Sequence, residues 1–590
     1  MAPHGRVLVL DGARVHALDI VRSLGRRSLS VHVGANVHDA IGFSSRFASA
    51  ARVYPDPAAE PDAFIAWLDA DIRSTGYDLV IPVTDVTGIP IARNLTELSA
   101  LCPLATEAFD KVQLVSDKSR TLEIARRLDV PCPTTVVVRH AGDIAQCVAH
   151  LRFPVVCKPL ASGAWGPSGY VALPVSYALD ERELRREVTR CLDTSPVLLQ
   201  EYRRGVGVGV EVLAHEGRIV QAFQHERLHE VPLSGGASTY RISVPLDPVL
   251  LDYSARLLEH LRWTGVAMVE FKVDRATSDI ALMEINGRFW GSLALSSRAG
   301  MAFASDLYDL LTTGHTVPRR AYRTGIRCRK LRDDIEWLKD SVAVNAQHPL
   351  VVAGVMRRRS RAELIAAAVR MFWPLQQYDV QVLWDPRPGL SDLRDILIAH
   401  ARGAARKIAE RGRKARAWWY RRRNTGKLAL RAGRARNVLF VCYGNIMRSP
   451  FASAYFASRS GAARNHVRTA SAGYFDKTGR AADPRAVAAG QRWNIDLSTH
   501  RSRKLDATLL DWADLVLVMD LANLEAVRNH YPAARDKTYL LGSLEVADHK
   551  TDVEIPDPYT GSDESVVMAY GRIAGAIDRL MVHVSSGSPP

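Results

Sequence analysis

Short apolar runs alternate with amphipathic segments of helix length through the first hundred residues of the chain. In order, these runs and segments cover residues 6–10, 17–27, 29–35, 63–74 and 78–83. Buried strands that alternate with helices are typical of a parallel α/β unit. We therefore predict an N-terminal parallel α/β domain over residues 1–105, in a chain of several α/β domains.

Charged residues interrupt the apolar pattern between residues 106 and 320. Lys118 opens a helical segment, and Lys158 ends the apolar run that begins at Phe153. The ammonium groups of two such lysines, on the buried side of a helix and a strand, can bind phosphate oxygens. The negative charge of the phosphate then offsets the free-energy cost of burying each ammonium group. A Gly/Ser-rich stretch at residues 162–169 is flexible enough to fold over the phosphates.

Two acidic residues interrupt the apolar strand patterns at 266–274 and 280–286. The turn between these strands predicts a hairpin that brings Glu270, Glu284 and Asn286 to one point. Oxygen ligands clustered around phosphates are what Mg²⁺ requires. The alternative, in which both glutamates face solvent on exposed strands, is less favoured.

These residues resemble an ATP-grasp domain, like those of carbamoyl-phosphate synthetases and related carboxylate–amine ligases. The resemblance implies an α+β fold over residues 106–320, with ATP and Mg²⁺ or Mn²⁺ as cofactors. It also implies a carboxylate and an amine as substrates, neither of which the sequence identifies. The implied nucleotide-binding residues are Lys118, Lys158, Ser162, Gly163, Gln200, Glu201 and Arg288, and the implied metal ligands are Glu270, Glu284 and Asn286.

Two further segments belong to this half of the chain. Residues 224–241 are rich in His, Arg and small residues, so this segment either covers the substrate or is a solvated loop. The side chains that would reach the substrate are His225, Arg227 and Arg241. Residues 321–400 are expected to form a helical extension. Its helical pattern predicts one packed face that contains Leu364, Ile365, Val369 and Phe372.

An apolar strand pattern at residues 437–441 leads into a short loop and then into a helix-like segment at 451–460. The loop starts at Cys442 and ends at Arg448. Backbone N–H groups in such a loop can surround phosphate oxygens, and the helix that follows adds its positive end. The positive electrostatic potential of these N–H groups and of the helix end also favours the thiolate form of Cys442.

This segment resembles the low-molecular-weight protein tyrosine phosphatases, and the resemblance continues to about residue 584. Its other matching pieces are SAG at 471–473, ADPRA around 483–485, HRSRKL from 500, DLVLVMD at 514–520 and DPY at 557–559. The resemblance implies a C-terminal α/β domain with a central parallel sheet, over residues 437–590. It implies a phosphoprotein or a small phosphomonoester as substrate, and no cofactor.

The resemblance also assigns a role to each residue of the site. Cys442 would attack phosphorus to form a phosphocysteine, and Arg448 would bind two phosphoryl oxygens as a planar fork. Ser449 would hydrogen-bond the sulfur as it leaves, and Asn445 would hold the loop open. Asp557 would act as the general acid that protonates the leaving oxygen and later activates water.

Three departures from the family pattern narrow this chemistry. Met447 stands where many members carry a second cysteine, so a protective disulfide with the nucleophile cannot form. No cysteine follows Cys442, which argues against arsenate reductases because those enzymes need downstream thiols. Ile446 stands where phosphoarginine phosphatases tend to have threonine, so phosphotyrosine is the expected substrate.

Positive charge is concentrated in one tract, residues 401–436. This tract holds 14 Lys or Arg and one acid, Glu410, and so accounts for +13 of the formal net charge of +15. It also contains Trp418, Trp419 and Tyr420. A solvated helical linker is the first interpretation, an anionic membrane surface is the second, and binding of nucleic acid is the least favoured.

The composition predicts packed hydrophobic cores, and neither a membrane span nor a disulfide framework. The chain has 590 residues, of which 47% are hydrophobic, and no apolar run approaches the ~20 residues of a membrane span. Seven cysteines without paired spacing predict neither a disulfide framework nor a metal site. The first apolar run is too short for a signal peptide. A cytoplasmic location is expected, at the inner membrane face if the basic tract binds lipid.

Two functions are compatible with these patterns. The first is a bifunctional enzyme that combines ATP-dependent carboxylate–amine ligation, through an acyl phosphate, with hydrolysis of phosphotyrosine. The alternative is a protein tyrosine phosphatase whose ATP-grasp half is a nucleotide-binding sensor or scaffold. The first is preferred, because a sensor could tolerate loss of the lysines and carboxylates that this chain retains.

Overall fold

A computed structural model describes residues 5–144, 147, 151–160, 163–166, 169–172, 175–192, 195–373, 376–460, 467–544 and 553–586. Tertiary contacts divide the chain into two compact units, Met1–Ile398 and Ala399–Pro590. Within the described ranges, no helix combines the length and the apolar character that crossing a membrane requires.

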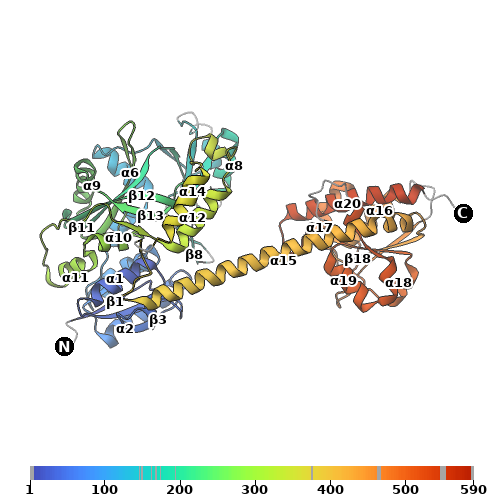
Figure 1. Cartoon of the computed structure of the whole chain (residues 1–590), viewed down its shortest axis with the longest axis horizontal. Coiled ribbons are helices and arrows are strands. Elements are labelled where there is room, and N and C mark those ends of the chain that lie inside the picture. Colours follow the sequence, from blue (N-terminus) through green and yellow to red (C-terminus); the bar gives the residue numbers. More distant parts are fainter. Residues whose placement is uncertain are drawn as a thin grey trace. The chain divides into compact units, whose positions relative to one another are not determined.

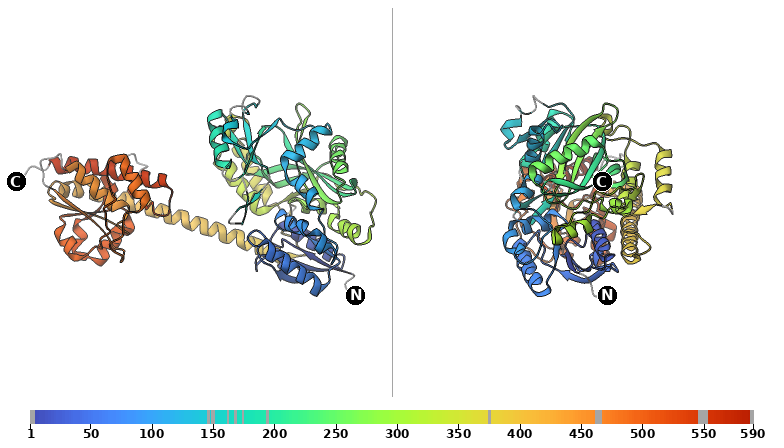
Figure 2. Two further views of the ribbon diagram at one scale, coloured as in Figure 1. Left: turned by 180° about the vertical axis from the view of Figure 1, so that it is seen from behind. Right: turned by 90° about the vertical axis from the view of Figure 1, so that its left-hand side faces the viewer.

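The first unit begins with a four-stranded parallel sheet (Figure 1 and Figure 2, blue). In spatial order its strands are β3 (Ala48–Val53), β2 (Ser30–Ala35), β1 (Arg6–Val9) and β4 (Leu79–Ile81). Val7 and Val9 pack with helix α1 (Val15–Gly25), whereas Leu8 packs with helix α2 (Pro61–Thr75). Because both faces of β1 are buried, its sequence is a continuous apolar run. The predicted parallel α/β domain is confirmed.

The remaining described strands of the first unit form two largely antiparallel sheets and one separate hairpin. The smaller has the order β5 (Thr135–Val138), β10 (Val197–Glu201), β6 (Val155–Pro159) and β9 (Ser176–Ala178). The larger has the order β15 (Asp279–Asn286), β14 (Gly265–Asp274), β11 (Val206–His215), β12 (Arg218–Val231), β13 (Ala237–Ser243), β16 (Arg327–Arg329) and β17 (Gln377–Tyr378), with only β16 and β17 parallel. A separate hairpin joins β7 (Gly163–Gly166) to β8 (Gly169–Ala172).

The helices of this unit connect and cover its sheets. They are α3 (Asp85–Arg93), α4 (Leu95–Ser99), α5 (Phe109–Ser116), α6 (Lys118–Arg127), α8 (Glu181–Leu192), α9 (Pro248–Leu261), α10 (Leu293–Ala299), α11 (Phe303–Thr313), α12 (Leu331–Ala343), α13 (Pro349–Val352) and α14 (Arg361–Met371). The expected packing of α14 is wrong. Ile365, Val369 and Phe372 are exposed, and the helix buries Met371 beside Leu331 of α12 instead. Its pattern contains apolar residues on several faces, so periodicity could not select the packed one.

The second unit contains a four-stranded parallel sheet, as predicted. Its order is β19 (Arg468–Gly473), β18 (Asn437–Cys442), β20 (Leu515–Val518) and β21 (Thr538–Leu540). Figure 1 shows α16 (Arg448–Ser460), α17 (Pro484–Gly490) and α20 (Asp563–Ser586) over one face, and α18 (Ala507–Trp512) and α19 (Leu521–His530) over the other. Val438 and Phe440 pack on the first face, and Leu439 and Val441 on the second.

The basic tract is helical as far as Ala432, within helix α15 (Pro386–Ala432). Residues 401–416 are exposed, but Ala417, Leu428 and Ala432 are buried in the two cores of the second unit. A solvated linker therefore describes only the first part of the tract. These three positions share one helix face, and the many arginines between them conceal the apolar stripe in the sequence.

Candidate active sites

Strand β18 ends at Cys442, and helix α16 begins at Arg448, so the loop between them is held at both ends. Asn445 in the loop has a left-handed backbone (φ 49°) and is buried, and its N–H donates to the Cys442 sulfur at 3.3 Å. The Ser449 hydroxyl lies 3.0 Å from the same sulfur. Gly473 permits close approach of β19, because a Cβ there would lie 2.6 Å from the Tyr443 carbonyl oxygen.

The side chain of Asn445 connects the loop to its surroundings. Its amide donates to the hydroxyls of Ser449 and Ser471, at 2.9 and 3.0 Å, and its oxygen accepts from the backbone N–H of Arg503 at 2.7 Å. His500 Nε2 lies 2.8 Å from the Asn445 carbonyl oxygen. Burial lowers the pKa of His500, against the opposing effect of this bond, so a neutral ring donates here.

Arg448 is buried and bound by two carboxylates. Its guanidinium donates to Asp520 at 2.7 Å, to Asp557 at 2.5 Å and to the carbonyl of Ile555 at 3.0 Å. Burial acts to lower the pKa of Arg448, but Cys442 and the two aspartates raise it overall. The expected nucleophile, arginine and acid thus lie together.

A cavity of about 270 Å³ opens over these groups. Its lining residues are Cys442, Tyr443, Gly444, Ile446, Met447, Arg448, Phe475, Arg480, Asp557 and Tyr559. The rings of Tyr474 and Phe475 lie 5.1 and 5.3 Å from that of Tyr443, and Tyr443 and Tyr559 are about half exposed at the rim. The cavity is therefore charged at its base and aromatic at its mouth.

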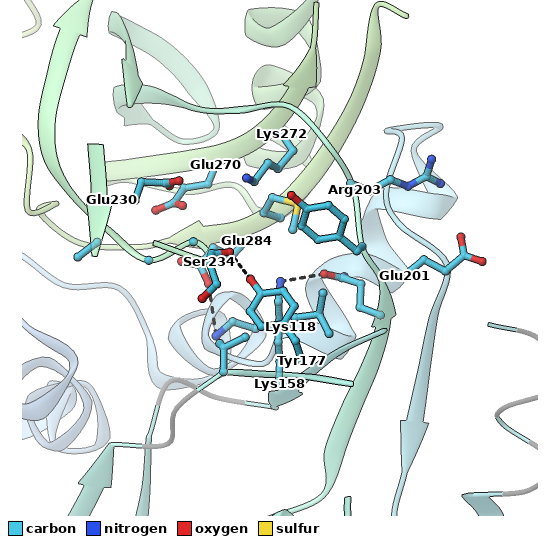
Figure 3. Close-up of a pocket in the computed structure, with 18 of the residues that line it drawn as sticks. Lys118, Lys158, Tyr177, Glu201, Arg203, Glu230, Ser234, Glu270, Lys272 and Glu284 are labelled. Atoms are coloured by element: carbon cyan, nitrogen blue, oxygen red, sulfur yellow. Dashed lines mark hydrogen bonds and ion pairs between the residues drawn. The ribbon is translucent and has the colours of Figure 1, made fainter. Parts of the chain in front are cut away.

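A second cavity, of about 320 Å³, lies in the first unit between the two antiparallel sheets. Figure 3 shows the ammonium groups of Lys118 and Lys158 and the carboxylates of Glu270 and Glu284 turned toward this space. Lys118 lies 3.3 Å from Glu284, and Lys158 donates to Gln200 at 2.8 Å. Burial lowers the pKa of Lys158 to about 8, although Glu284 opposes this effect.

The two glutamates are direct neighbours across β14 and β15. Burial raises the pKa of Glu270 against the opposing charge of Arg227, which binds it at 2.5 Å. Burial acts in the same direction on Glu284, but Lys118 and Lys158 outweigh it and hold its pKa at about 2. One carboxylate is therefore compensated by two lysines, and the other by an arginine.

The donor set of the hairpin fits a divalent cation. Asn286 Nδ2 donates to a carboxylate oxygen of Glu270 and of Glu284, at 3.2 Å each, so this amide joins the two carboxylates, while its own Oδ1 accepts from Arg288. Hard oxygen donors of this kind suit Mg²⁺ or Mn²⁺. Among the described residues no group of three or more His, Cys, Asp or Glu side chains is arranged for a metal ion.

The remaining expected residues have these positions. Glu201 lines the cavity, but its carboxylate is directed away from the centre of the space (Figure 3) and accepts from the backbone N–H of Arg152 at 3.3 Å. Arg288 donates to Asn286 Oδ1 at 3.3 Å and pairs with Asp85 at 3.1 Å. Gly163 begins β7, whereas Ser162 lies outside the described residues.

The segment 224–241 is not a loop throughout, because most of it forms the paired strands β12 and β13. Arg241 is buried and bound to Asp379 at 2.5 Å, so it does not cover a substrate. Arg227 alone of the three expected residues lines the cavity.

Several site residues were missed by reasoning from the sequence. Asp520 follows the apolar strand β20, a position that could have indicated a functional carboxylate. Ser471 and His500 lie in segments that carry the family resemblance, but their bonds to Asn445 depend on the fold. Asp85 lies in the predicted N-terminal α/β domain, residues 1–105, and nothing in the sequence connects it with Arg288.

Comparison with known proteins agrees with this geometry. The family model described as low molecular weight phosphotyrosine protein phosphatase matches residues 437–587. The probable low molecular weight protein-tyrosine-phosphatase EpsP of Ralstonia nicotianae is 34% identical over 149 residues, which are 25% of this chain and 96% of that protein. The protein-arginine-phosphatase of Geobacillus stearothermophilus is 34% identical over 143 residues, 24% of this chain and 92% of that protein.

The first unit has its own match. A family model described as ATP-grasp in the biosynthetic pathway with Ter operon matches residues 193–333. The solved structure of an L-amino acid ligase from Bacillus licheniformis aligns with 54% of this chain and 76% of that one, at 14% identity and a TM-score of 0.43.

The parallel sheet and the Cys442–Arg448 loop define a cysteine-dependent phosphatase. Through residues 437–587 the chain belongs to the low molecular weight phosphotyrosine protein phosphatase family. It joins this domain to an ATP-grasp domain in one polypeptide.

Proposed function

We propose that the protein is a bifunctional enzyme. The second unit hydrolyses phosphotyrosine through a phosphocysteine, and the first unit uses ATP to convert a carboxylate into an acyl phosphate that an amine then attacks. The set of Cys442, Ser449, Arg448 and Asp557 around one cavity supports the phosphatase. The paired lysines opposite the glutamate hairpin support the ligase.

The phosphatase reaction follows from the contacts of the loop. The Cys442 sulfur attacks phosphorus, the bond from phosphorus to the leaving oxygen breaks, and Asp557 gives that oxygen its proton. Arg448 exchanges its contact with Asp557 for phosphoryl oxygens and stays oriented by Asp520. Water then attacks the phosphocysteine, Asp557 takes a proton from it, and Ser449 hydrogen-bonds the departing sulfur.

The lining of the cavity favours an aryl phosphate. Tyr443 and Tyr559 at the rim can stack on a phenyl ring. Ile446 offers no hydrogen-bond acceptor to a guanidinium group, whereas phosphoarginine would bring several N–H donors into the cavity. These features favour phosphotyrosine over phosphoarginine as the substrate.

In the ligase, Lys118 and Lys158 would bind phosphate oxygens of ATP, and Glu270, Glu284 and Asn286 would hold the divalent ion. When bound, that ion spreads the negative charge of the phosphoryl group in transfer. Arg288, beside Asn286, binds an oxygen of the γ-phosphate or of the acyl phosphate. Gly235 and Gly236 line the same cavity, and their lack of a side chain allows close approach of a ligand.

The phosphatase is tested with the full-length protein and an aryl phosphate. Cys442→Ser removes the nucleophile and should abolish turnover. The control Cys147→Ser changes a buried cysteine in a hydrophobic cluster of the first unit and should leave turnover unchanged. Phosphotyrosine and phosphoarginine peptides of equal sequence then test the leaving group, and a preference for phosphoarginine would overturn the substrate assignment. Equal turnover by the parent and Cys442→Ser would overturn the phosphatase assignment itself.

The ligase is tested by screening carboxylate and amine pairs for ADP release. Glu284→Gln should abolish release, whereas Glu181→Gln, on the exposed surface of α8, should not. Binding of ATP that Glu284→Gln weakens, without ADP from any pair, would favour a nucleotide sensor over a ligase.

A further inference from the structure

The exposed face of α15 in the second unit carries a line of apolar side chains. Ile408, Trp419 and Leu430 are 69%, 58% and 70% exposed. They follow one another at intervals of 11 residues, close to three helical turns, so successive members are offset by only about 20° around the helix. The opposite face of the same helix buries Ala417 and Leu428 in the second unit.

Basic residues border this line on both sides. Arg411 and Arg422 follow one edge, and Arg416, Arg423 and Lys427 follow the other, by their positions around the helix. Trp418 lies beside Trp419, with ring centroids 5.2 Å apart and edge to face, and the Arg422 guanidinium lies 5.6 Å from the Trp418 ring. The face is therefore apolar along its middle and cationic at its edges.

We propose that this face binds an anionic lipid surface. Side chains such as Trp and Leu are stable at the boundary between headgroups and acyl chains, while Arg and Lys attract anionic headgroups. The residues from Ala417 onward are already held as a helix by packing, so binding does not require that part of the tract to fold.

Two other occupants fit the face less well. A second copy of the chain would bring two tracts of charge +13 together, and their repulsion opposes association. A nucleic acid needs cations for its phosphates, but it leaves a line of aliphatic side chains without a partner. An anionic bilayer satisfies both the charge and the apolar line.

The test is flotation of the full-length protein with vesicles. We expect binding to phosphatidylcholine vesicles that contain 30% phosphatidylserine, little binding to pure phosphatidylcholine, and weaker binding as salt rises. The variant Ile408→Ser/Trp419→Ser/Leu430→Ser should bind at least tenfold more weakly. The matched control Val352→Ser/Leu383→Ser/Met568→Ser changes three exposed apolar residues outside the tract and should bind like the parent.

Turnover of a soluble aryl phosphate shows that each variant is folded, because the line lies outside the active site. Vesicle binding that the first triple variant retains in full would overturn the proposal. The proposal would also be overturned if the protein bound a DNA or RNA duplex more tightly than the anionic vesicles and the first triple variant kept that binding. A dimer seen in sedimentation and abolished by the same variant would likewise overturn it.

Discussion

At the scale of the residue, charge pairing decides what each cavity can do. Lys158 is partly buried beside Gln200, and desolvation lowers its pKa to about 8, well below that of an exposed lysine. A phosphate oxygen would stabilise its charged form, so under the proposed function ATP binding would be linked to protonation of this lysine.

This linkage predicts that ATP binding weakens in alkaline solution. Below pH 8 Lys158 is already charged, whereas above pH 8 binding must take up a proton. The Kd for ATP should therefore rise toward tenfold per pH unit above pH 8, as measured by calorimetry. Lys158→Arg keeps its charge and should flatten this profile, and Lys158→Met should bind weakly at every pH. A flat profile for the parent protein would contradict the prediction.

Asp520 and Asp557 both bind Arg448, but only Asp557 lines the cavity. Asp557→Asn should lower kcat/KM about 100-fold for phenyl phosphate and much less for p-nitrophenyl phosphate, whose leaving group needs no proton. Asp520→Asn should lower kcat/KM by the same factor for both substrates, because it changes only the orientation of Arg448. An equal effect of Asp557→Asn on the two substrates would remove its role as general acid.

At the scale of the element, α15 shows how one helix serves two surroundings. Residues 401–416 of this helix are exposed, whereas Leu428 and Ala432 are buried in one hydrophobic core with residues of α16 and α20. Arg413 lies 3.4 Å from Glu554, which precedes the segment with Ile555 and Asp557. The phosphatase domain therefore extends before β18, into residues that composition alone marks as a tether.

This packing predicts a difference between two leucines of the same helix. Leu428→Ala should destabilise the phosphatase domain by about 2 to 4 kcal/mol, because it leaves a cavity in a closed core. Leu430→Ala, on the exposed face, should change stability by less than about 0.5 kcal/mol. The measurement is the urea concentration at which the full-length protein loses aryl phosphatase activity. Equal midpoints would mean that α15 is not part of the folded domain.

At the scale of the whole molecule, each candidate site is built within one unit. The described lining residues of the cavity around Lys118 and Lys158 come from Met1–Ile398, and those of the cavity over Cys442 from Ala399–Pro590. The chemistry of each should therefore survive inactivation of the other.

Independence is tested with two variants that each remove one chemistry. Cys442→Ser should leave ATP affinity unchanged, and Glu284→Gln should leave aryl phosphatase kcat and KM unchanged. A change of more than about threefold in either measurement would reveal coupling between the units. Titration calorimetry and steady-state kinetics on the same protein preparations provide the comparison.

Particular residues show how far the sequence could be interpreted. The apolar runs predicted the N-terminal parallel sheet, and interruption of two strands by Glu270 and Glu284 predicted their meeting, because both signals are local. The expected position of Arg241 was wrong, since its partner Asp379 lies far along the chain. The packed face of α14 was also wrong, because several faces carry apolar residues.

The sequence by itself determined the strand–loop–helix around Cys442, the glutamate hairpin and the concentration of charge in residues 401–436. Each depends on spacing within a short segment, where backbone geometry allows few alternatives. Only the tertiary structure decided that Asp520 orients Arg448, that Asn445 joins Ser471 to Arg503, and that Leu428 belongs to a core. These contacts join residues far apart in the chain, and their free energy exists only once packing has removed water from between them.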